Sequence, residues 1–393
     1  MLVPITNTPR DYEWGSTTLL ADLEGRQPSG RPEAEVWFGD HPGSPAIVPD
    51  GRSLGAWIES EAGGSQTPAR LPYLLKLLAA ASPLSIQAHP SRDEAIDGYA
   101  REEAAGVPRD AADRTYRDDN HKPELIVAIS DTFTALAGLR EIDATRRLVA
   151  TLGPAGNGLA DHLQDTDAAA ALRNTISWLL SGGARRDLDA IIAAAAEAHS
   201  AEFAAELSLV GRLAAAHPGD PGVVVAMLMN LVTLRRGEGV FVPAGVLHAY
   251  LEGLGVELMA ASDNVLRGGL TPKHMDVDEL LRVLDPTPGP APVVHPVDVG
   301  GGISRYATDV PDFALLRVTV EPEKPARLPV SGVTIAVAAA GRVQVRTGRS
   351  DDGIELTPGR AVFVTPDETE LQFSGSGQVF VAQPGGASSA SAS

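Results

Sequence analysis

An alanine-rich block in the middle of the chain separates two stretches that have the pattern of β-structure. Of the 80 residues from 141 to 220, 21 are alanine, and alanine is the strongest helix former. On either side, short apolar runs alternate with Pro, Gly and Asp, which is typical of strands joined by turns. The sequence therefore predicts a mainly β fold that is interrupted by a helical insertion.

The apolar residues of the central block recur at helical spacing. We expect helices over 185–200 and 201–217, and a third over 222–234, where the pair Asp-Pro at 220–221 forms an N-cap and a first turn. A further short helix is expected over 278–284. The expected strands are 35–38, 71–78, 84–88, 125–129, 315–320, 333–338, 343–346, 361–364 and 379–381.

The same patterns divide the chain into units. Residues 1–140 and 235–285 are expected to form one β-unit together, with residues 141–234 inserted as an α-helical domain. Residues 286–385 are expected to form a second β-unit. The last residues, 386–393, are Gly, Ala and Ser, and we expect a disordered tail.

Composition excludes several kinds of site and partner. The chain has no cysteine, which excludes disulfides, thiolate metal sites and a cysteine nucleophile. Its 51 acidic side chains outnumber 32 basic ones, so neither nucleic acid nor an anionic membrane is an expected partner. Neither a signal-peptide pattern nor an apolar stretch of about 20 residues is found. A cytoplasmic location is therefore expected, and separately we expect a monomer.

Lysine is rare in this chain and is concentrated in polar segments. Only four of the 32 basic residues are lysine, and the others are arginine. Three of the four, Lys76, Lys122 and Lys273, lie in or beside the segments that carry the candidate chemistry. A small anionic substrate would therefore meet local positive charge within an acidic surface.

Two of these segments precede the alanine-rich block. In the segment SIQAH, a strand would place Ser85, Gln87 and His89 on one face. The run DNHKPE places Lys122 and Glu124 two residues apart before an apolar strand. The simpler alternative is a polar edge strand and a solvated loop, but this does not explain why a rare lysine lies beside Pro and Glu.

A third segment, GEGVFVPAGVLH at residues 237–248, has the form G-x5-P-x-G-x-x-H. It resembles the second signature of the cupin barrel, a small jelly roll whose inward side chains hold a metal. Its Pro and Gly residues are expected to aim His248 inward. Together with Gln87, His89 and Glu124, this gives an amide oxygen, a carboxylate and two imidazoles. That donor set suits a divalent first-row ion, zinc above all.

A fourth segment, residues 257–273, ends in a glycine loop that carries Arg267 and Lys273. Scattered surface charge is the simpler interpretation. Two cations on a glycine loop are also what a phosphate or an enediolate oxygen requires.

Taken together, these segments resemble the type I phosphomannose isomerases. The similar stretches include YEWGS near Trp14 and AEVWFGDHP near Trp37, and they span roughly residues 10–280. The resemblance implies a zinc-dependent aldose–ketose isomerase with one Zn²⁺ per chain, which interconverts mannose 6-phosphate and fructose 6-phosphate through a cis-enediol. It also implies two cupin jelly-roll units plus the helical domain. The second unit is expected to be metal-free, because GRAVFVTP at 359–366 looks like a cupin turn without its histidine.

The resemblance assigns a role to each matching position. The matches to the family's zinc ligands are Gln87, His89, Glu124 and His248. The match to its essential arginine is Arg267, which would stabilise the developing enediolate. The matches to residues near the substrate are Lys76, Ser85, Lys122, Glu257 and Lys273.

Two tasks remain to be divided among these residues. Lys122 and Glu257 are the candidates for the base that moves the proton, with His121 and Asp263 as alternatives. The residues expected to hold the phosphate are Ser85, Lys273 and Lys76.

Three other functions are compatible with parts of the pattern. A metal-dependent cupin oxygenase would usually carry a His-x-His pair, which is Gln-x-His here. A non-catalytic sugar-binding cupin would have no reason to keep Lys122, Glu124 and Arg267 together. A bifunctional isomerase and nucleotidyltransferase would need a nucleotide-binding domain, for which the chain leaves no space.

Overall fold

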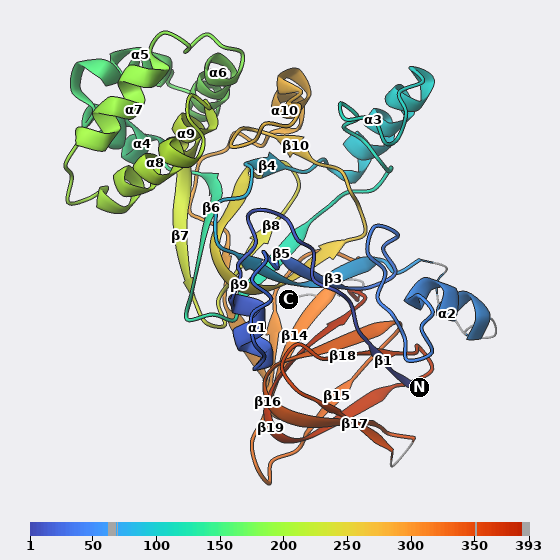
Figure 1. Cartoon of the computed structure of the whole chain (residues 1–393). Helices are drawn as coiled ribbons and strands as arrows, with labels where there is room; N and C mark the ends of the chain where they lie inside the picture. Colours follow the sequence, from blue (N-terminus) through green and yellow to red (C-terminus); the bar gives the residue numbers. More distant parts are fainter. Residues whose placement is uncertain (62–67, 69, 350–351, 387–393) are drawn as a thin grey trace, which may run out of the picture.

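The computed structural model describes residues 1–61, 68, 70–349 and 352–386, and it consists of two antiparallel sheets and a block of helices (Figure 1). The prediction of a mainly β fold with inserted helices is confirmed. The predicted tail lies almost entirely outside the described residues.

The first sheet is arranged around one long strand, β9 (His248–Ala260). The first half of β9 pairs with β4 and β6, and its second half pairs with β3 and β5. The other nine strands of this sheet are β2 (Glu35–Phe38), β3 (Tyr73–Ala80), β4 (Gln87–Ala88), β5 (Glu124–Ala128), β6 (Thr132–Leu139), β7 (Met229–Arg235), β8 (Gly239–Val242), β10 (Leu266–Arg267) and β11 (Val293–Val294).

In the second sheet, the long strands β16 (Thr334–Thr347) and β19 (Glu370–Gln383) pair over most of their length. The other seven strands are β1 (Leu2–Ile5), β12 (Pro296–Gly300), β13 (Ile303–Tyr306), β14 (Ala314–Val320), β15 (Ala326–Pro329), β17 (Gly353–Leu356) and β18 (Ala361–Val364). Because β1 pairs with β18, the first strand of the chain belongs to the second sheet. The assignment of all of residues 1–140 to the first unit is wrong at this strand.

Most of the helices belong to the insertion. They are α4 (Ile142–Ala150), η1 (Gly153–Gly156), α5 (Asn157–His162), α6 (Ala168–Leu180), α7 (Leu188–Glu197), α8 (Ala204–Ala216), α9 (Gly222–Val225) and η2 (Ala226–Leu228). The helices outside it are α1 (Leu19–Glu24), α2 (Leu54–Glu61), α3 (Arg92–Ala104) and α10 (Val277–Val283). The helices predicted over 185–200, 201–217 and 278–284 correspond to α7, α8 and α10.

The helix predicted over 222–234 is wrong in its second half. Helical structure ends at Leu228, and the next residues form β7, which pairs with β6. The segment MNLVTLR alternates buried and more exposed positions toward its end, and β-branched residues favour the strand once a partner edge is available. The inserted helices therefore end before the predicted limit of 234.

Alternate side chains of the first sheet face two different apolar cores. In β5, Leu125 and Val127 lie in the core between the two sheets, whereas Ile126 and Ala128 lie in the core on the other face. Because both faces are buried, the strand is a continuous apolar run. Glu124 shares the face of Ile126 and Ala128, since strand side chains alternate with period two.

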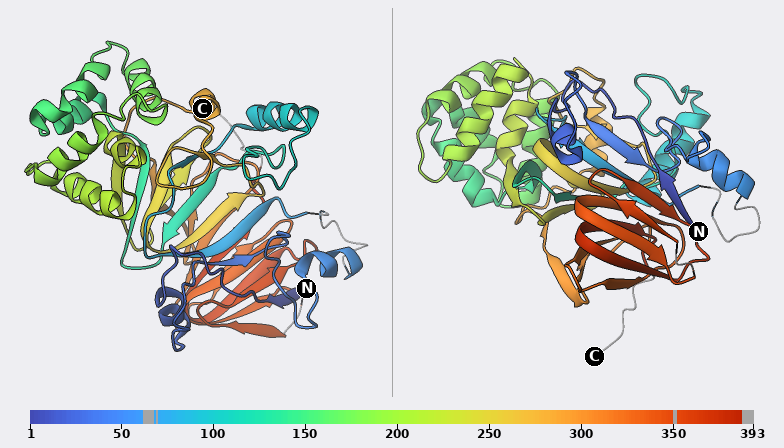
Figure 2. Two further views of the ribbon diagram at one scale, coloured as in Figure 1. Left: turned by 45° about the horizontal axis from the view of Figure 1, so that its top comes forward. Right: turned by 60° about the horizontal axis from the view of Figure 1, so that its bottom comes forward.

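The core between the sheets joins the two β-units into one body. Figure 2 shows the second sheet, in orange and red, packed against the first sheet. The Oη atom of the fully buried Tyr73 on β3 lies 2.9 Å from the carbonyl oxygen of Val333 and 3.0 Å from that of Ala382. The hydroxyl of Tyr306, on β13 of the second sheet, donates to the carbonyl of Gly237, which lies between β7 and β8 of the first sheet, at 2.9 Å.

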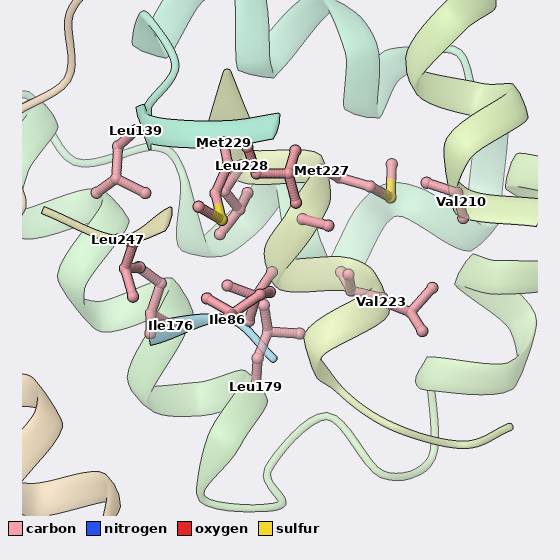
Figure 3. Close-up of a cluster of buried hydrophobic side chains, with 14 of the residues drawn as sticks. Ile86, Leu139, Ile176, Leu179, Val210, Val223, Met227, Leu228, Met229 and Leu247 are labelled. Carbon is pink, nitrogen blue, oxygen red and sulfur yellow. The ribbon is translucent and has the colours of Figure 1, made fainter. Parts of the chain in front are cut away.

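A separate core attaches the helical block to the first sheet. Figure 3 shows Ile86 and Leu247, which flank β4 and β9, among the apolar side chains of the inserted helices. This packing holds the segment before Gln87 in place. In the described part of the chain, no helix is long and apolar enough to cross a membrane.

Candidate active site

Three buried side chains of the first sheet meet on its inner face. His89, Glu124 and His248 each offer a ligand atom, and these atoms lie within 4.8 Å of one another. Nε2 of His89 is 3.1 Å from Oε1 of Glu124, and Nε2 of His248 is 3.4 Å from Oε2. Two imidazoles and one carboxylate in this arrangement can hold a divalent metal ion.

Local structure places each of the three. His89 follows β4, and Ser91 caps α3 immediately afterwards with a capping box that includes Glu94. The turn before His248 contains Gly245 at φ +78, where a Cβ atom would lie 2.8 Å from a backbone oxygen. The backbone N–H of Gly245 also donates to the carbonyl of His89 at 2.8 Å. The turn thus links the segments of both histidines.

The imidazole of His89 has the tautomer and the protonation state of a metal ligand. Its Nδ1–H donates to the carbonyl of Asn264 at 2.7 Å, which leaves Nε2 as the free lone pair. Nε2 is buried and has no hydrogen-bond partner within the described residues. Burial, reinforced by the charge of Lys122, lowers the pKa of His89 to about 4, so the ring is neutral at physiological pH. A buried, unpaired imidazole nitrogen fits a metal ligand.

The predicted ligand Gln87 lies beside this group. Its backbone is directly opposite His248 on β9 and opposite Arg267 on β10. Its Nε2 donates to Oγ of Ser85 at 3.0 Å, which leaves Oε1 available. The structure therefore places Ser85 where it orients the Gln87 amide.

Two lysines are held by carboxylates at the site. Nζ of Lys122 lies 2.9 Å from Oε1 of Glu124. Nζ of Lys76 lies 2.8 Å from Oε2 of Glu257 and 3.5 Å from Oε1 of Glu35. Burial alone would lower the pKa of Lys76, but these carboxylates raise it above its usual value. Burial raises the pKa of Glu257, although the charge of Lys76 opposes this.

The sequence interpretation missed Tyr250 and Asn264. Tyr250 is two residues after His248 on β9, and its buried hydroxyl donates to Oε2 of Glu124 at 3.1 Å. Besides binding His89, the fully buried Asn264 accepts a hydrogen bond from the backbone N–H of Arg117 at 2.7 Å. Period two from His248 was a signal for Tyr250. Asn264 lies in the run ASDN at residues 261–264, but its role follows only from its long-range contacts.

Arg267 and Lys273, both predicted, lie near a third cation that was not predicted, Arg117. Burial lowers the pKa of Arg267 and of Lys273; the charge of Arg117 contributes to both shifts, and that of Arg267 to the second. Within the described ranges, none of these three side chains has an ion-pair partner. The cluster can accept an anion.

The two alternative bases are occupied by other contacts. Oδ1 of Asp263 lies 3.1 Å from Nε2 of His41, and although burial opposes it, this contact lowers the pKa of the carboxyl. Nε2 of His121 lies 2.7 Å from Oδ2 of Asp312, which is in the loop between β13 and β14 of the second sheet. A lowered pKa makes Asp263 a weak base at neutral pH.

The fold and the site define an antiparallel β protein with a buried His–Glu–His group that can hold a metal ion. Residues 2–142 match the family model described as phosphomannose isomerase type I, catalytic domain. The chain is 34% identical to mannose-6-phosphate isomerase of Escherichia coli (strain K12), over 95% of this chain and 97% of that protein. It is 31% identical to the mannose-6-phosphate isomerase of Bos taurus, over 93% of this chain and 94% of that one.

Solved structures of mannose 6-phosphate isomerases superpose on this chain. The apo form of mannose 6-phosphate isomerase from Salmonella typhimurium superposes with a TM-score of 0.88 at 32% identity, covering 98% of this chain and 99% of that one. A zinc-bound mannose 6-phosphate isomerase gives 0.88 at 33% identity, with the same coverage. The chain belongs to the type I phosphomannose isomerase family, and the resemblance predicted from the sequence is confirmed.

Proposed function

We propose that this chain is a zinc-dependent isomerase that interconverts mannose 6-phosphate and fructose 6-phosphate through a cis-enediol. The observation that carries the proposal is the buried His–Glu–His group, in which Nε2 of His89 lies 3.1 Å from Oε1 of Glu124 but has no hydrogen-bond partner within the described residues. The names of the relatives support the same reaction and the same metal.

The proposed zinc ligands are Gln87, His89, Glu124 and His248. Neutral imidazoles, a carboxylate and an amide oxygen suit a site that keeps an open position. When bound, zinc supplies a Lewis acid that polarises the substrate carbonyl without redox chemistry.

Proton transfer between C1 and C2 of the sugar is assigned to Lys122 and Glu257. Lys122 contacts Oε1 of Glu124, whereas Tyr250 contacts Oε2 and also interacts with Glu257. Burial raises the pKa of Glu257, which makes it a stronger base than an exposed carboxylate. Lys76 holds Glu257 in place, so in this proposal Lys76 acts beside the proposed metal ligands.

The phosphate is assigned to the cations at the other end. Arg267 is half-buried near Gln87, and Lys273 and Arg117 are exposed beyond it. A dianionic phosphate would pair with Lys273 and Arg117, and this places the reacting carbons toward Arg267 and the ligand group. Arg267 then stabilises negative charge on the enediolate.

We also propose that each sheet is a cupin-type jelly roll and that the second contains no metal. Apolar side chains such as Val318, Val343 and Phe373 fill the inner core of the second sheet. A monomeric state and a cytoplasmic location stay predictions from the sequence.

A coupled isomerase assay combined with metal analysis tests the proposal. The purified chain should contain about one zinc ion and interconvert the two sugar phosphates with or without oxygen. Prolonged chelation should abolish the reaction, and added zinc should restore it. Undiminished activity of a fully metal-free preparation would refute the zinc site. Strict dependence on oxygen would instead favour an oxygenase, and sugar binding without turnover a binding protein.

A further inference from the structure

A buried aspartate beside the second sheet contacts the segment that leads to Glu124. Asp312 lies just before β14, and the next residue, Phe313, is fully buried in the core between the sheets. Nε2–H of His121 donates to Oδ2 of Asp312 at 2.7 Å. His121 is only three residues before Glu124.

The other oxygen of Asp312 contacts the segment that follows His89. The guanidinium of Arg92 donates to Oδ1 at 3.0 Å. Arg92 is the first residue of α3 and lies three residues after His89. A single carboxylate therefore bridges two segments that each carry a residue of the His–Glu–His group.

The hydrogen bond between Asp312 and His121, which we call the junction, is largely shielded from water. The side chain of Asp312 is 8% exposed and that of His121 16% exposed, so water competes little for the hydrogen bond. Burial by itself raises the pKa of Asp312, but His121 and the charge of Arg92 lower it below its usual value. The carboxyl is therefore ionised at neutral pH, and charged hydrogen bonds of this kind are the stronger ones.

The segment held by this junction has no regular secondary structure. Residues 118–123 lie between helix α3 and strand β5 without forming either element. Asn264 anchors the segment from the first sheet by donating to the carbonyls of Asp118 at 2.8 Å and Asn120 at 2.9 Å. Asp312 anchors it from the second sheet. Between these anchors and β5 lies Lys122, whose Nζ is 2.9 Å from Oε1 of Glu124.

We propose that Asp312 is a positioning residue for the isomerase reaction: it holds His121 and thereby keeps Lys122 against Glu124. This inference rests on the proposed function and gives the second sheet a part in the reaction. Asp312 acts through its neighbours, because its own contacts are with His121 and Arg92.

Steady-state kinetics of Asp312→Ala and Asp312→Asn, at saturating zinc, test the inference. Asp312→Ala should lower kcat at least tenfold while KM stays within twofold, because a misplaced Lys122 affects the chemical step more than substrate binding. Asp312→Asn keeps an oxygen that accepts from His121 but loses the charge, so it should recover part of this loss. Zinc content should stay at the wild-type value in both.

Tyr306→Phe is the matched control. It removes another buried hydrogen bond between the second sheet and the first, the one to the carbonyl of Gly237 at 2.9 Å. General loosening of the two sheets would lower kcat in this variant as well. We expect it to keep wild-type kcat, and a loss equal to that of Asp312→Ala would overturn the inference.

A double-mutant cycle with His121→Ala tests the route through His121. The double variant should have the kcat of His121→Ala within twofold, since residues that act as a unit are non-additive. Additive losses, or a kcat of Asp312→Ala within twofold of wild type, would contradict the inference. Should Asp312→Ala not fold, Asp312→Asn decides: at least a threefold loss of kcat supports the inference, and a smaller change overturns it. An inactive wild-type chain would refute the proposed function itself.

Discussion

At the scale of single residues, burial and neighbouring charge set the chemistry of the site. His89 is neutral because it is completely buried near Lys122, and its tautomer is fixed by the carbonyl of Asn264. Glu124 stays ionised: burial raises its pKa, but the charge of Lys122 and the hydrogen bond from His248 lower it well below the usual range. One neutral imidazole and one carboxylate are thus in the protonation states that a metal ion requires.

The arginine opposite Gln87 gives the first prediction at this scale. Arg267→Ala should lower kcat by about 10²–10³, the usual loss when one donor to a developing oxyanion is removed. Zinc content should not change, because Arg267 is outside the His–Glu–His group. Kinetics combined with metal analysis checks this. Parallel loss of zinc and activity would mean that Arg267 maintains the structure of the site.

The exposed cations give the second prediction. Arg117→Ala should raise KM for the sugar phosphate about tenfold with a smaller change in kcat, because a charged hydrogen bond to phosphate contributes about 1.5–3 kcal/mol. Lys273→Ala should change KM in the same direction. Arg109→Ala is the control, since that exposed arginine is paired with Glu103. Equal KM values for Arg117→Ala and the control would remove Arg117 from the phosphate site.

At the scale of elements, a carboxylate holds α3, α10 and the segment before Arg117 together. Oε1 of Glu279 on α10 accepts from Arg101 of α3 at 2.6 Å and from the hydroxyl of Tyr116 at 2.5 Å. Arg282 donates to the same oxygen at 2.5 Å. Arg117 directly follows Tyr116, and Lys273 lies six residues before Glu279, so the network stabilises the segments that carry these two cations.

This network predicts a pH dependence of stability. Burial raises the pKa of Glu279, but hydrogen bonds from Arg282, Tyr116 and Arg101 lower it from 4.5 to about 2. The unfolded chain therefore binds the proton at higher pH than the folded chain, so this stabilisation is complete above pH 4.5 and is lost toward pH 2. Allowing for solvent screening, we expect Glu279→Gln to cost about 1–2 kcal/mol at pH 7.

Urea unfolding at several pH values measures this effect. The difference in free energy of unfolding between wild type and Glu279→Gln should shrink as the pH falls below 4.5. Glu355→Gln, which breaks only an exposed pair with Arg342, should differ from wild type by less than about 0.5 kcal/mol throughout. A difference for Glu279→Gln that does not vary with pH would contradict the assignment.

At the scale of the whole molecule, the two sheets share one apolar core, and separating them would expose that core to water. Leu125 and Leu258 of the first sheet pack in the same cluster as Ile335 and Phe380 of the second. Strand β1, at the start of the chain, pairs within the second sheet. The chain therefore crosses between the two sheets more than once.

A truncated chain that ends at residue 294 tests this unity. Removing all of the second sheet except β1 exposes the first sheet's half of the shared core, and large exposed apolar patches cause aggregation. We expect the truncated chain to be insoluble or to bind a hydrophobic dye strongly. A soluble truncated monomer that unfolds cooperatively in urea would contradict this expectation.

Local patterns in the sequence were sufficient for the main elements and for the candidate ligands. The spacing of Gln87 and His89, the turn before His248 and the alanine-rich block all depend on residues that are neighbours in sequence. These patterns are set by backbone geometry over a few residues, so the sequence alone determined them. The same locality explains the error at β7, where pairing with β6 decided the structure of residues 229–235.

Only the tertiary structure decided which groups meet. Lys76 and Glu257 form an ion pair because the antiparallel register of β3 and β9 sets them directly opposite each other. Asp312 reaches His121 across 191 residues of sequence, and the position of Asn264 against His89 depends on contacts of the same range. Such pairings follow from the register of strands and from how the sheets pack, and the local sequence contains no signal for either.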